Sequence, residues 1–327
     1  MQEIIINSNE AGQRFDKFLL KYFKEAPAGF IYKMLRKKNI VLNDKKSDGK
    51  DKLNLGDIVK IYMADGTISR LRGEDKSGEY DIPYSEHVKI VYEDTDVIIV
   101  NKEVGVLSQK AEKNGISINE YIIAYLIASG QISYEQLRTF TPGICNRLDR
   151  NTSGLIIAGK SLIGLQTMSE MLKMRTMDKY YLTLVTGKIK EKEKIKGYLT
   201  KNTKTNKVSV KPYSDKDTQY IETEYEPIGF GDDITLLKVK LITGKTHQIR
   251  AHLSSVNHPI IGDYKYGNKK INDIYRKKYG ISYQLLHSWK MCFPKMEGGC
   301  SALSDKVITA QIPEDFQKII DETICLI

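Results

Sequence analysis

The strongest constraint on the fold is the alternation of short β-rich runs with single helical segments over residues 87–327. The β-rich runs are dominated by Val, Ile, Leu and Tyr, whereas the other segments repeat their apolar residues at helical spacing. Such a mixture favours an α+β fold with a mostly antiparallel sheet. The expected strands are VKIVYED, DVIIVNK, YLTLVTG, TLLKVKLITG and VITAQI, and the expected helices are INEYIIAYLIA, LIGLQTMSEMLKM, THQIRAHLSSV and EDFQKIIDETI.

Residues 1–63 have a different pattern, in which two short amphipathic helices are followed by two strands. Apolar residues recur at helical spacing over residues 13–22 and again at Ile31, Met34 and Leu35. The segments IVLN and DIVKIYM then indicate short strands. The opposite faces of the two helices are basic and carry Lys17, Lys21, Lys24, Lys33, Arg36 and Lys37.

The positive charge of the chain is concentrated in this unit. The chain has 51 Lys and Arg against 41 Asp and Glu, a formal charge of +10. Residues 1–60 hold 13 basic and 8 acidic residues, which is half of the excess. A basic excess favours a nucleic-acid partner, because binding releases counterions. The alternative is that both Lys-rich faces are only solvated, as charged helix faces usually are.

Two segments have the composition of connections. Residues 64–86 are polar with three glycines, which predicts a linker between a first domain over 1–63 and a larger domain over 87–327. The Lys-rich segment Lys188–Asp217 indicates a protruding hairpin or loop.

The segment CNRLDRNTSGLIIAGK places an acidic side chain where a turn meets a strand. Arg147 and Asp149 precede a turn rich in Asn, Thr, Ser and Gly, and the apolar strand Leu155–Ala158 follows. The carboxylate is therefore expected at the edge of a strand. Taken alone, an Asp beside an Arg is usually an ordinary turn or ion-pair residue.

The segment THQIRAHLSSV supplies a candidate arginine. Thr246 is the expected N-cap of a helix on which His247, Arg250 and Ser254 share one face. Arg250 is then either a surface residue or part of an active site. A zinc site of His247, His252 and His258 is disfavoured, because the spacing lacks HExxH and no cysteine is near.

Targeting and membrane signals are absent from the sequence. It opens MQEIIINSNE without a basic and apolar signal region, and its four cysteines show no CxxC spacing. The most apolar run, over 122–128, is far below the roughly 20 residues that span a bilayer. We expect a cytoplasmic protein without a membrane role.

Read together, these motifs resemble a known family. RFDKFL, IYKMLRKKNIVLN and LGDIVKI, within residues 12–63, are similar to the αL RNA-binding domain. Over about 89–317, the chain resembles bacterial pseudouridine synthases that modify ribosomal RNA and some transfer RNA. This resemblance rests on YEDTDVIIVNK, NRLDRNTSGL, KYYLTLVTG, LITGKTHQIRAHL, HPIIGDYKYG and LLHS.

The resemblance implies a role for each matching position. Asp149 matches the catalytic aspartate, Tyr181 the active-site tyrosine and Arg250 the basic residue that pairs with the aspartate. Arg147 matches the arginine that takes the place of the flipped base. The implied activity is conversion of uridine to pseudouridine, most consistently in large-subunit ribosomal RNA, by a monomer without cofactor or metal. The six basic residues listed above for the two amino-terminal helices are expected to contact phosphates.

Three positions depart from the family pattern, and two other functions are possible. Asn146 stands where His is common, Lys245 where Arg is usual, and Glu103 where Pro is usual. The first alternative function is a non-catalytic RNA-binding or ribosome-assembly protein with the same fold. The second is a metal-dependent hydrolase.

Overall fold

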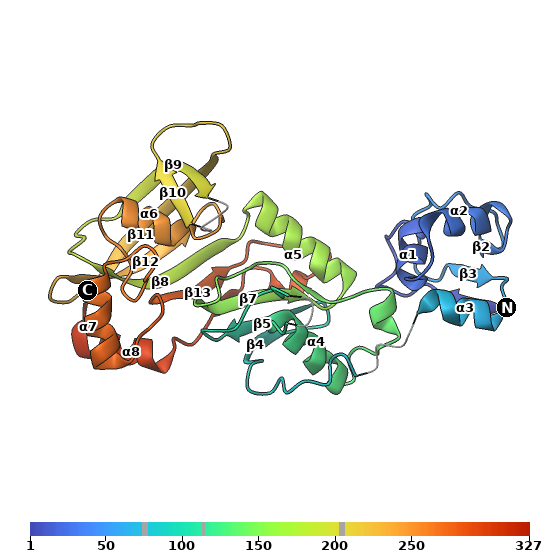
Figure 1. The fold of residues 1–327 in the computed structure, drawn as a ribbon, viewed down its shortest axis with the longest axis horizontal. Helices are drawn as coiled ribbons and strands as arrows, with labels where there is room; N and C mark the ends of the chain where they lie inside the picture. The colour runs from blue at the N-terminus through green and yellow to red at the C-terminus, as the bar shows by residue number, and fades with distance from the viewer. Residues whose placement is uncertain (74–77, 113–114, 203–206) are drawn as a thin grey trace.

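The computed structural model describes residues 1–73, 78–112, 115–202 and 207–327. The chain is elongated, with a small amino-terminal unit beside a larger domain that is built around one long sheet (Figure 1).

The amino-terminal unit has two helices packed on a three-stranded antiparallel sheet of order β1-β3-β2. Both predicted helices and both predicted strands are present, and β1 was not predicted. The apolar residues of the two helices are buried in one cluster with Ile40, Val59 and Ile61. The elements are β1 Gln2–Ile5, α1 Phe15–Tyr22, α2 Ala28–Arg36, β2 Ile40–Leu42 and β3 Ile58–Ile61.

The segment after β3 differs from the predicted linker. Residues Asp65–Arg72 form helix α3, and Ile68 and Leu71 are buried in the same cluster as α1 and α2. Two apolar residues three positions apart are enough to seat this otherwise polar helix. The amino-terminal unit therefore extends to Arg72, and residues 74–77 of the predicted linker lie outside the described part of the chain.

The larger domain confirms the α+β prediction. Its main sheet has the strand order β10-β9-β11-β12-β8-β13-β7-β5-β4, and β6, β14 and β15 pair at its sides. All of these pairings are antiparallel except that of β13 with β7. The strands are β4 Ile90–Glu93, β5 Val97–Lys102, β6 Gly143–Ile144, β7 Ser153–Gly159, β8 Asp178–Thr186, β9 Glu193–Asn202, β10 Lys207–Lys211, β11 Gln219–Phe230, β12 Ile234–Leu241, β13 Leu286–Cys292, β14 Val307–Thr309 and β15 Cys325–Leu326.

Helices cover both faces of the central strands. Along β5, Ile98 and Val100 belong to the apolar cluster that includes α4, whereas Val97 and Ile99 belong to the cluster that includes α5. Strands buried on both faces read as continuous apolar runs, which explains DVIIVNK and GLIIAG. The helices are α4 Ile118–Ala128, α5 Leu162–Met174, α6 Gln248–Ser255, α7 Lys269–Tyr279 and α8 Glu314–Thr323.

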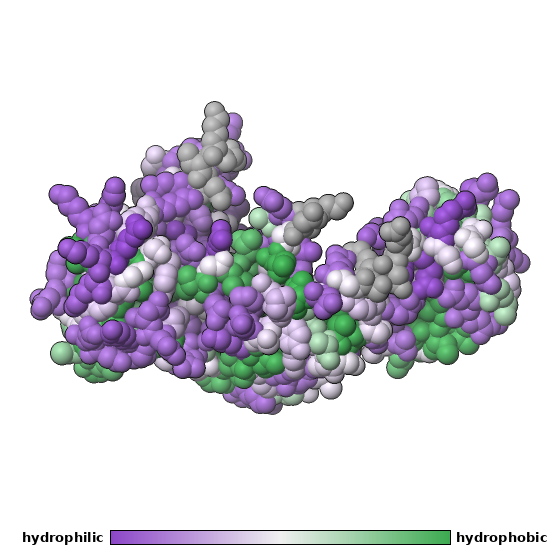
Figure 2. All heavy atoms as spheres, turned by 60° about the horizontal axis from the view of Figure 1, so that its bottom comes forward, coloured by the Kyte–Doolittle hydropathy of each residue, from purple (hydrophilic) through white to green (hydrophobic). Residues whose placement is uncertain are grey.

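The Lys-rich segment forms the predicted hairpin. Strands β9 and β10 pair in antiparallel register and project from one end of the sheet (Figure 1). On the face drawn in Figure 2, hydrophilic side chains dominate this projection and much of the amino-terminal unit, whereas hydrophobic residues gather between them.

Candidate active site

Asp149 lies in the turn that leads into β7, at the edge of the strand as predicted from the sequence. The backbone N–H of Thr152 donates to the carbonyl of Asp149 at 3.0 Å and closes the turn. The Thr152 hydroxyl accepts from the side-chain amide of Gln284 at 3.1 Å, which ties the turn to the segment before β13. The carboxylate keeps 25% exposure, so it is held in place and still open to a ligand.

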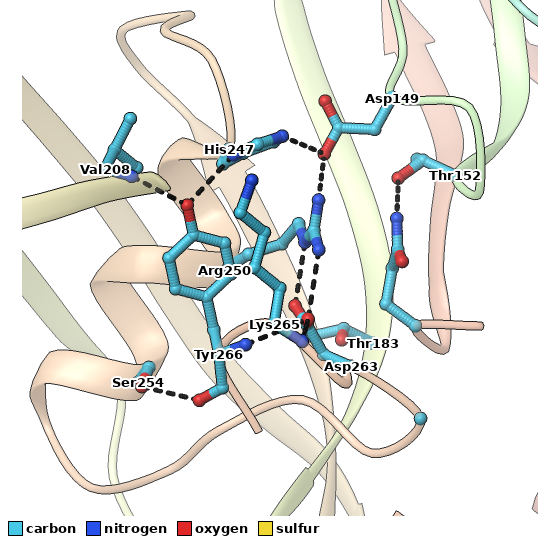
Figure 3. Close-up of polar contacts among 12 residues, drawn as sticks. Asp149, Thr152, Thr183, Val208, His247, Arg250, Ser254, Asp263, Lys265 and Tyr266 are labelled. Carbon is cyan, nitrogen blue, oxygen red and sulfur yellow. Dashed lines mark hydrogen bonds and ion pairs between the residues drawn. The ribbon is translucent and has the colours of Figure 1, made fainter. Parts of the chain in front are cut away.

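Arg250 joins Asp149 to a second carboxylate (Figure 3). Its Nη1 donates to Asp149 Oδ2 at 2.7 Å, while Nε and Nη2 donate to the two oxygens of Asp263 at 2.7 and 3.0 Å. The guanidinium fork uses both edges at once, which a point charge such as an ammonium cannot do. Arg250 is therefore a buried and paired residue, which excludes the alternative of a surface arginine.

Asp263 is the main site residue that the sequence analysis missed. Its side chain is 1% exposed, and Oδ1 also accepts the backbone N–H groups of Lys265 and Tyr266 at 2.9 and 3.1 Å. Burial alone would lower the pKa of Arg250, but the hydrogen bonds and charges of Asp263 and Asp149 raise it. Arg250 is thus a permanent cation whose orientation is fixed from behind by Asp263.

The helix that carries Arg250 has its N-cap at His247, one residue after Thr246, the predicted N-cap. His247 occupies the cap position with φ 54°, and α6 starts at Gln248. The side-chain oxygen of Gln248 accepts the backbone N–H of Lys245 at 3.1 Å and the hydroxyl of Thr243 at 2.8 Å. Gln248 thereby holds the turn before the helix, and the N-cap residue His247 makes no side-chain capping hydrogen bond.

Tyr181 lies on β8, opposite Ser288 of β13 and Val239 of β12. Its side chain is almost fully buried. Burial raises the pKa of Tyr181 to about 12, with the neighbouring Ser288 side chain opposing and the charge of Asp149 adding to the rise. The hydroxyl is therefore protonated at neutral pH, within range of the electrostatic influence of Asp149.

The remaining predicted residues lie apart from the ion pair. Arg147 is exposed on the segment before Asp149, and its Nη1 donates to Gln109 at 3.4 Å. The six predicted RNA-binding cations of the amino-terminal unit are all exposed. In Figure 1 this unit lies across the interdomain junction from the larger domain, which carries the ion pair. The three histidines of the zinc alternative contact different partners, and no group of potential ligands in the described ranges could hold a metal.

A buried lysine fastens the backbone around Asp149. Lys102 is fully buried, and its Nζ donates to the carbonyls of Glu103, Val106 and Arg150 at 2.7, 2.8 and 3.2 Å. Burial lowers the pKa of Lys102 to about 7, against the opposing charges of Asp149 and Glu103. The three contacts hold the turn of Asp149 against the loop after β5.

Replacing Lys102 by Met should destabilise the fold, because three buried carbonyls lose their donor. We expect the free energy of unfolding to fall by about 3 kcal/mol, measured as the urea midpoint. Lys89→Met is the matched control, since Lys89 is 60% exposed and pairs with Glu103 at the surface. Equal midpoints for Lys102→Met and the wild type would show that Lys102 does not fasten the turn.

Comparison with known proteins decides the family. A model of the RNA pseudouridylate synthase family matches residues 96–255, which include both Asp149 and Arg250. An RNA pseudouridine synthase of Mycoplasma capricolum is 31% identical over 293 residues, covering 88% of this chain and 93% of the relative. The chain belongs to the RNA pseudouridine synthase family. It is therefore an RNA-modifying isomerase.

Other members of the family support this assignment over nearly the whole chain. Ribosomal large subunit pseudouridine synthase C of Haemophilus influenzae is 29% identical, covering 97% of this chain and 94% of the relative. A solved structure, human RNA pseudouridylate synthase domain containing 4, has a TM-score of 0.57 at 19% identity and covers 71% of this chain and 92% of its own. The latter likeness shows that the pseudouridine synthase fold is shared.

Two of the three departures from the family pattern, Asn146 and Glu103, have local explanations in this pseudouridine synthase. The Asn146 side chain donates to the carbonyl of Leu155 at 3.1 Å and accepts the N–H of Ile157 at 2.8 Å, so it binds the chain before Asp149 to β7. Glu103 forms a surface ion pair with Lys89 at 2.8 Å.

Within the described residues, no helix is long and apolar enough to cross a membrane.

Proposed function

We propose that this pseudouridine synthase isomerises specific uridines of large-subunit ribosomal RNA, with Asp149 as the nucleophile. The observation that carries the proposal is the 2.7 Å pair of Asp149 and Arg250, which is backed by buried Asp263. A partly exposed carboxylate that is paired with a fixed cation and aimed by it suits attack on a sugar carbon. The ribosomal target is inferred from the names of relatives such as that of Haemophilus influenzae.

The reaction needs neither an oxidant nor an energy source. An oxygen of Asp149 either bonds to C1′ or removes the proton at C2′, and the electron pair of the N1–C1′ bond leaves with uracil. The base turns while bound. C5 then bonds to C1′ as the bond between Asp149 and C1′ breaks or, in the glycal route, as C2′ takes its proton back from Asp149. The C5 proton is lost and N1 is protonated. The ester and glycal routes make the same demand on Asp149, which is that it be ionised.

Base flipping gives the target uridine access to this carboxylate. A stacked uridine must leave the helix at a cost of about a few kcal/mol. Arg147 is exposed two residues before Asp149, so its side chain can enter the space that the base leaves. Tyr181 would stack on the free base, with its protonated hydroxyl as a donor in the steps at C5.

The amino-terminal cations are proposed to contact phosphates. Lys17, Lys24, Lys33, Arg36 and Lys37 all lie on exposed faces of α1 and α2 or just after them. Lys21 and Lys24 also line a cleft between this unit and the larger domain, together with Arg70 and Arg138. RNA that crosses the junction would meet positive charge on both sides.

We further expect the protein to be a monomer in the cytoplasm.

Neutralising one basic face should weaken RNA binding without slowing chemistry. We expect Lys33→Ala, Arg36→Ala and Lys37→Ala combined to raise KM and to reduce the slope of log affinity against log salt by about three units, roughly one for each lost phosphate contact. The single-turnover rate at saturating enzyme should stay at the wild-type value. Substitutions are preferable to deleting residues 1–63, because the deletion would separate α3 from its core.

The matched control removes three cations from α7, as Arg276→Ala, Lys277→Ala and Lys278→Ala, which are likewise exposed. An equal loss of slope in the two triple variants would mean that net charge matters and the α2 face does not. The function itself is tested by tritium release from RNA labelled at uridine C5, together with mapping of pseudouridine in cells with and without the gene. Binding without tritium release would support the non-catalytic alternative.

A further inference from the structure

His247 lies at the rim of the active site in an unfavourable backbone conformation. It precedes α6 with φ 54°, a left-handed conformation that is costly for a residue with a side chain. Its side chain does not cap the helix. Instead the ring lies between the hydroxyl of Tyr266 and the carboxylate of Asp149 (Figure 3).

The contacts of Tyr266 determine which ring nitrogen of His247 carries the proton. The backbone N–H of Val208 on β10 donates to the Tyr266 hydroxyl oxygen at 2.9 Å. The same hydroxyl lies 2.9 Å from His247 Nδ1. If Tyr266 donates its own proton to Nδ1, both the hydroxyl and Nδ1 are paired; if Nδ1 donated, the hydroxyl would accept twice and its proton would have no partner. The neutral ring therefore carries its proton on Nε2.

This Nε2–H faces the reacting carboxylate without bonding to it. Nε2 lies 3.8 Å from Asp149 Oδ2, which is too long for a hydrogen bond. Arg250 occupies the same oxygen at 2.7 Å. Among the described residues no acceptor lies within hydrogen-bond distance of Nε2, and the side chain keeps 11% exposure. The donor is thus available to a nucleotide bound at Asp149.

The surroundings keep the ring neutral. Burial lowers the pKa of His247, and the positive charges of Arg250 and Lys265 lower it further, against the opposing effects of Asp149 and Asp263. A neutral ring with a single N–H can donate to an oxygen without transferring a proton. Such a donor can stabilise the negative charge on the detached uracil without protonating it, so the base can still react at C5.

We propose that His247 is a further catalytic residue, whose Nε2–H donates to uracil O2 while the N1–C1′ bond breaks. The inference rests on the proposed role of Asp149. As Asp149 takes C1′ or the C2′ proton, the electron pair of N1–C1′ spreads over N1, C2 and O2, and a donor placed beforehand at O2 stabilises that charge. The proton of His247 stays on Nε2 throughout.

The test compares full-length wild type with His247→Ala and His247→Gln in single turnovers at saturating enzyme. Loss of one such donor should slow His247→Ala about 100-fold, whereas Gln, which can place an N–H near Nε2, should recover part of the rate. RNA affinity should change by less than about threefold. With 2-thiouridine at the target position, the loss for His247→Ala should shrink, because the donor and O2 form one interacting pair.

A second measurement reads the tautomer directly. Nitrogen-15 NMR of histidine-labelled enzyme should show His247 with its proton on Nε2, and Tyr266→Phe should shift the proton toward Nδ1. Tyr264→Phe is the matched control, because this exposed hydroxyl of the same loop bonds Asp273 instead. An Nδ1–H tautomer in the wild type, or a wild-type rate for His247→Ala, overturns the proposal.

Asp149→Asn, run in parallel, separates this inference from the proposed function. If Asp149→Asn turns over at the wild-type rate, the nucleophile is assigned wrongly and the role of His247 fails with it. If Asp149→Asn is inactive and His247→Ala is unimpaired, only the role of His247 is overturned.

Discussion

Asp149→Asn is expected to abolish pseudouridine formation while the RNA still binds with an affinity within a few-fold of the wild type. Asn has nearly the same shape as Asp, and its amide oxygen can still accept from Arg250 Nη1. A neutral amide, however, can neither attack C1′ nor remove the C2′ proton. We expect turnover to fall by at least about 10⁴-fold, as when a nucleophile is removed from a preorganised site. Phosphate contacts are untouched, so affinity is preserved.

The measurement is C5 tritium release together with binding of the same RNA. Asp178→Asn is the matched control, because Asp178 lies in the same domain and pairs with Lys240 at the surface, 43% exposed. The control should retain wild-type turnover. Appreciable turnover by Asp149→Asn would show that another group performs the nucleophilic or basic step.

The secondary-structure elements were predictable where the pattern of apolar residues was clear, either as a continuous run or at helical spacing. DVIIVNK and GLIIAG are strands buried on both faces, and the helices α1, α2, α4, α5 and α8 each carry apolar residues at helical spacing. Helix α3 was missed because its sequence, DGTISRLR, has only Ile68 and Leu71 to bury and begins with a glycine-containing turn. Its helical state is decided by packing on α1 and α2, which a local pattern does not contain.

The sequence singled out Asp149 and Arg250, which the structure pairs, but not the residues that support them. Asp149 and Arg250 stand in segments with recognisable frames, but neither segment reveals that Asp263 lies behind Arg250. The available signal was the single Asp between the apolar IIG and the aromatic YKYG of HPIIGDYKYG. Lys102 was hidden in the same way, since a lysine at the end of a strand is ordinarily exposed. Both roles depend on burial that arises only in the folded chain.

The position of His247 illustrates a further limit of helical periodicity. On a helix beginning after Thr246, His247 and Arg250 share a face, which predicted their proximity. The structure puts His247 before the helix in a left-handed conformation, beside a turn in which Gln248 accepts the backbone N–H of Lys245. The proximity was therefore right, whereas the direction of the ring, on which its chemistry depends, follows from Tyr266 and Val208.

Arg250→Met is expected to cripple turnover and to destabilise the protein, because Arg250 serves two carboxylates. Without the guanidinium, Asp149 loses the cation that aims it, and we expect turnover to fall by at least about 10³-fold. Asp263, at 1% exposure, becomes a buried charge without its partner. Breaking a buried pair in this way costs about 3–5 kcal/mol. Single-turnover kinetics and urea unfolding measure the two effects separately.

The double variant Arg250→Met with Asp263→Asn distinguishes catalytic loss from structural loss. Neutralising Asp263 removes the unpaired charge, while its side-chain oxygen can still accept the N–H groups of Lys265 and Tyr266. Stability should therefore recover by most of the lost amount, since the two residues are directly coupled. Turnover should not recover, because nothing aims Asp149. If activity returned along with stability, Arg250 would be needed only to hold the fold, and orientation of Asp149 by the guanidinium could be discarded.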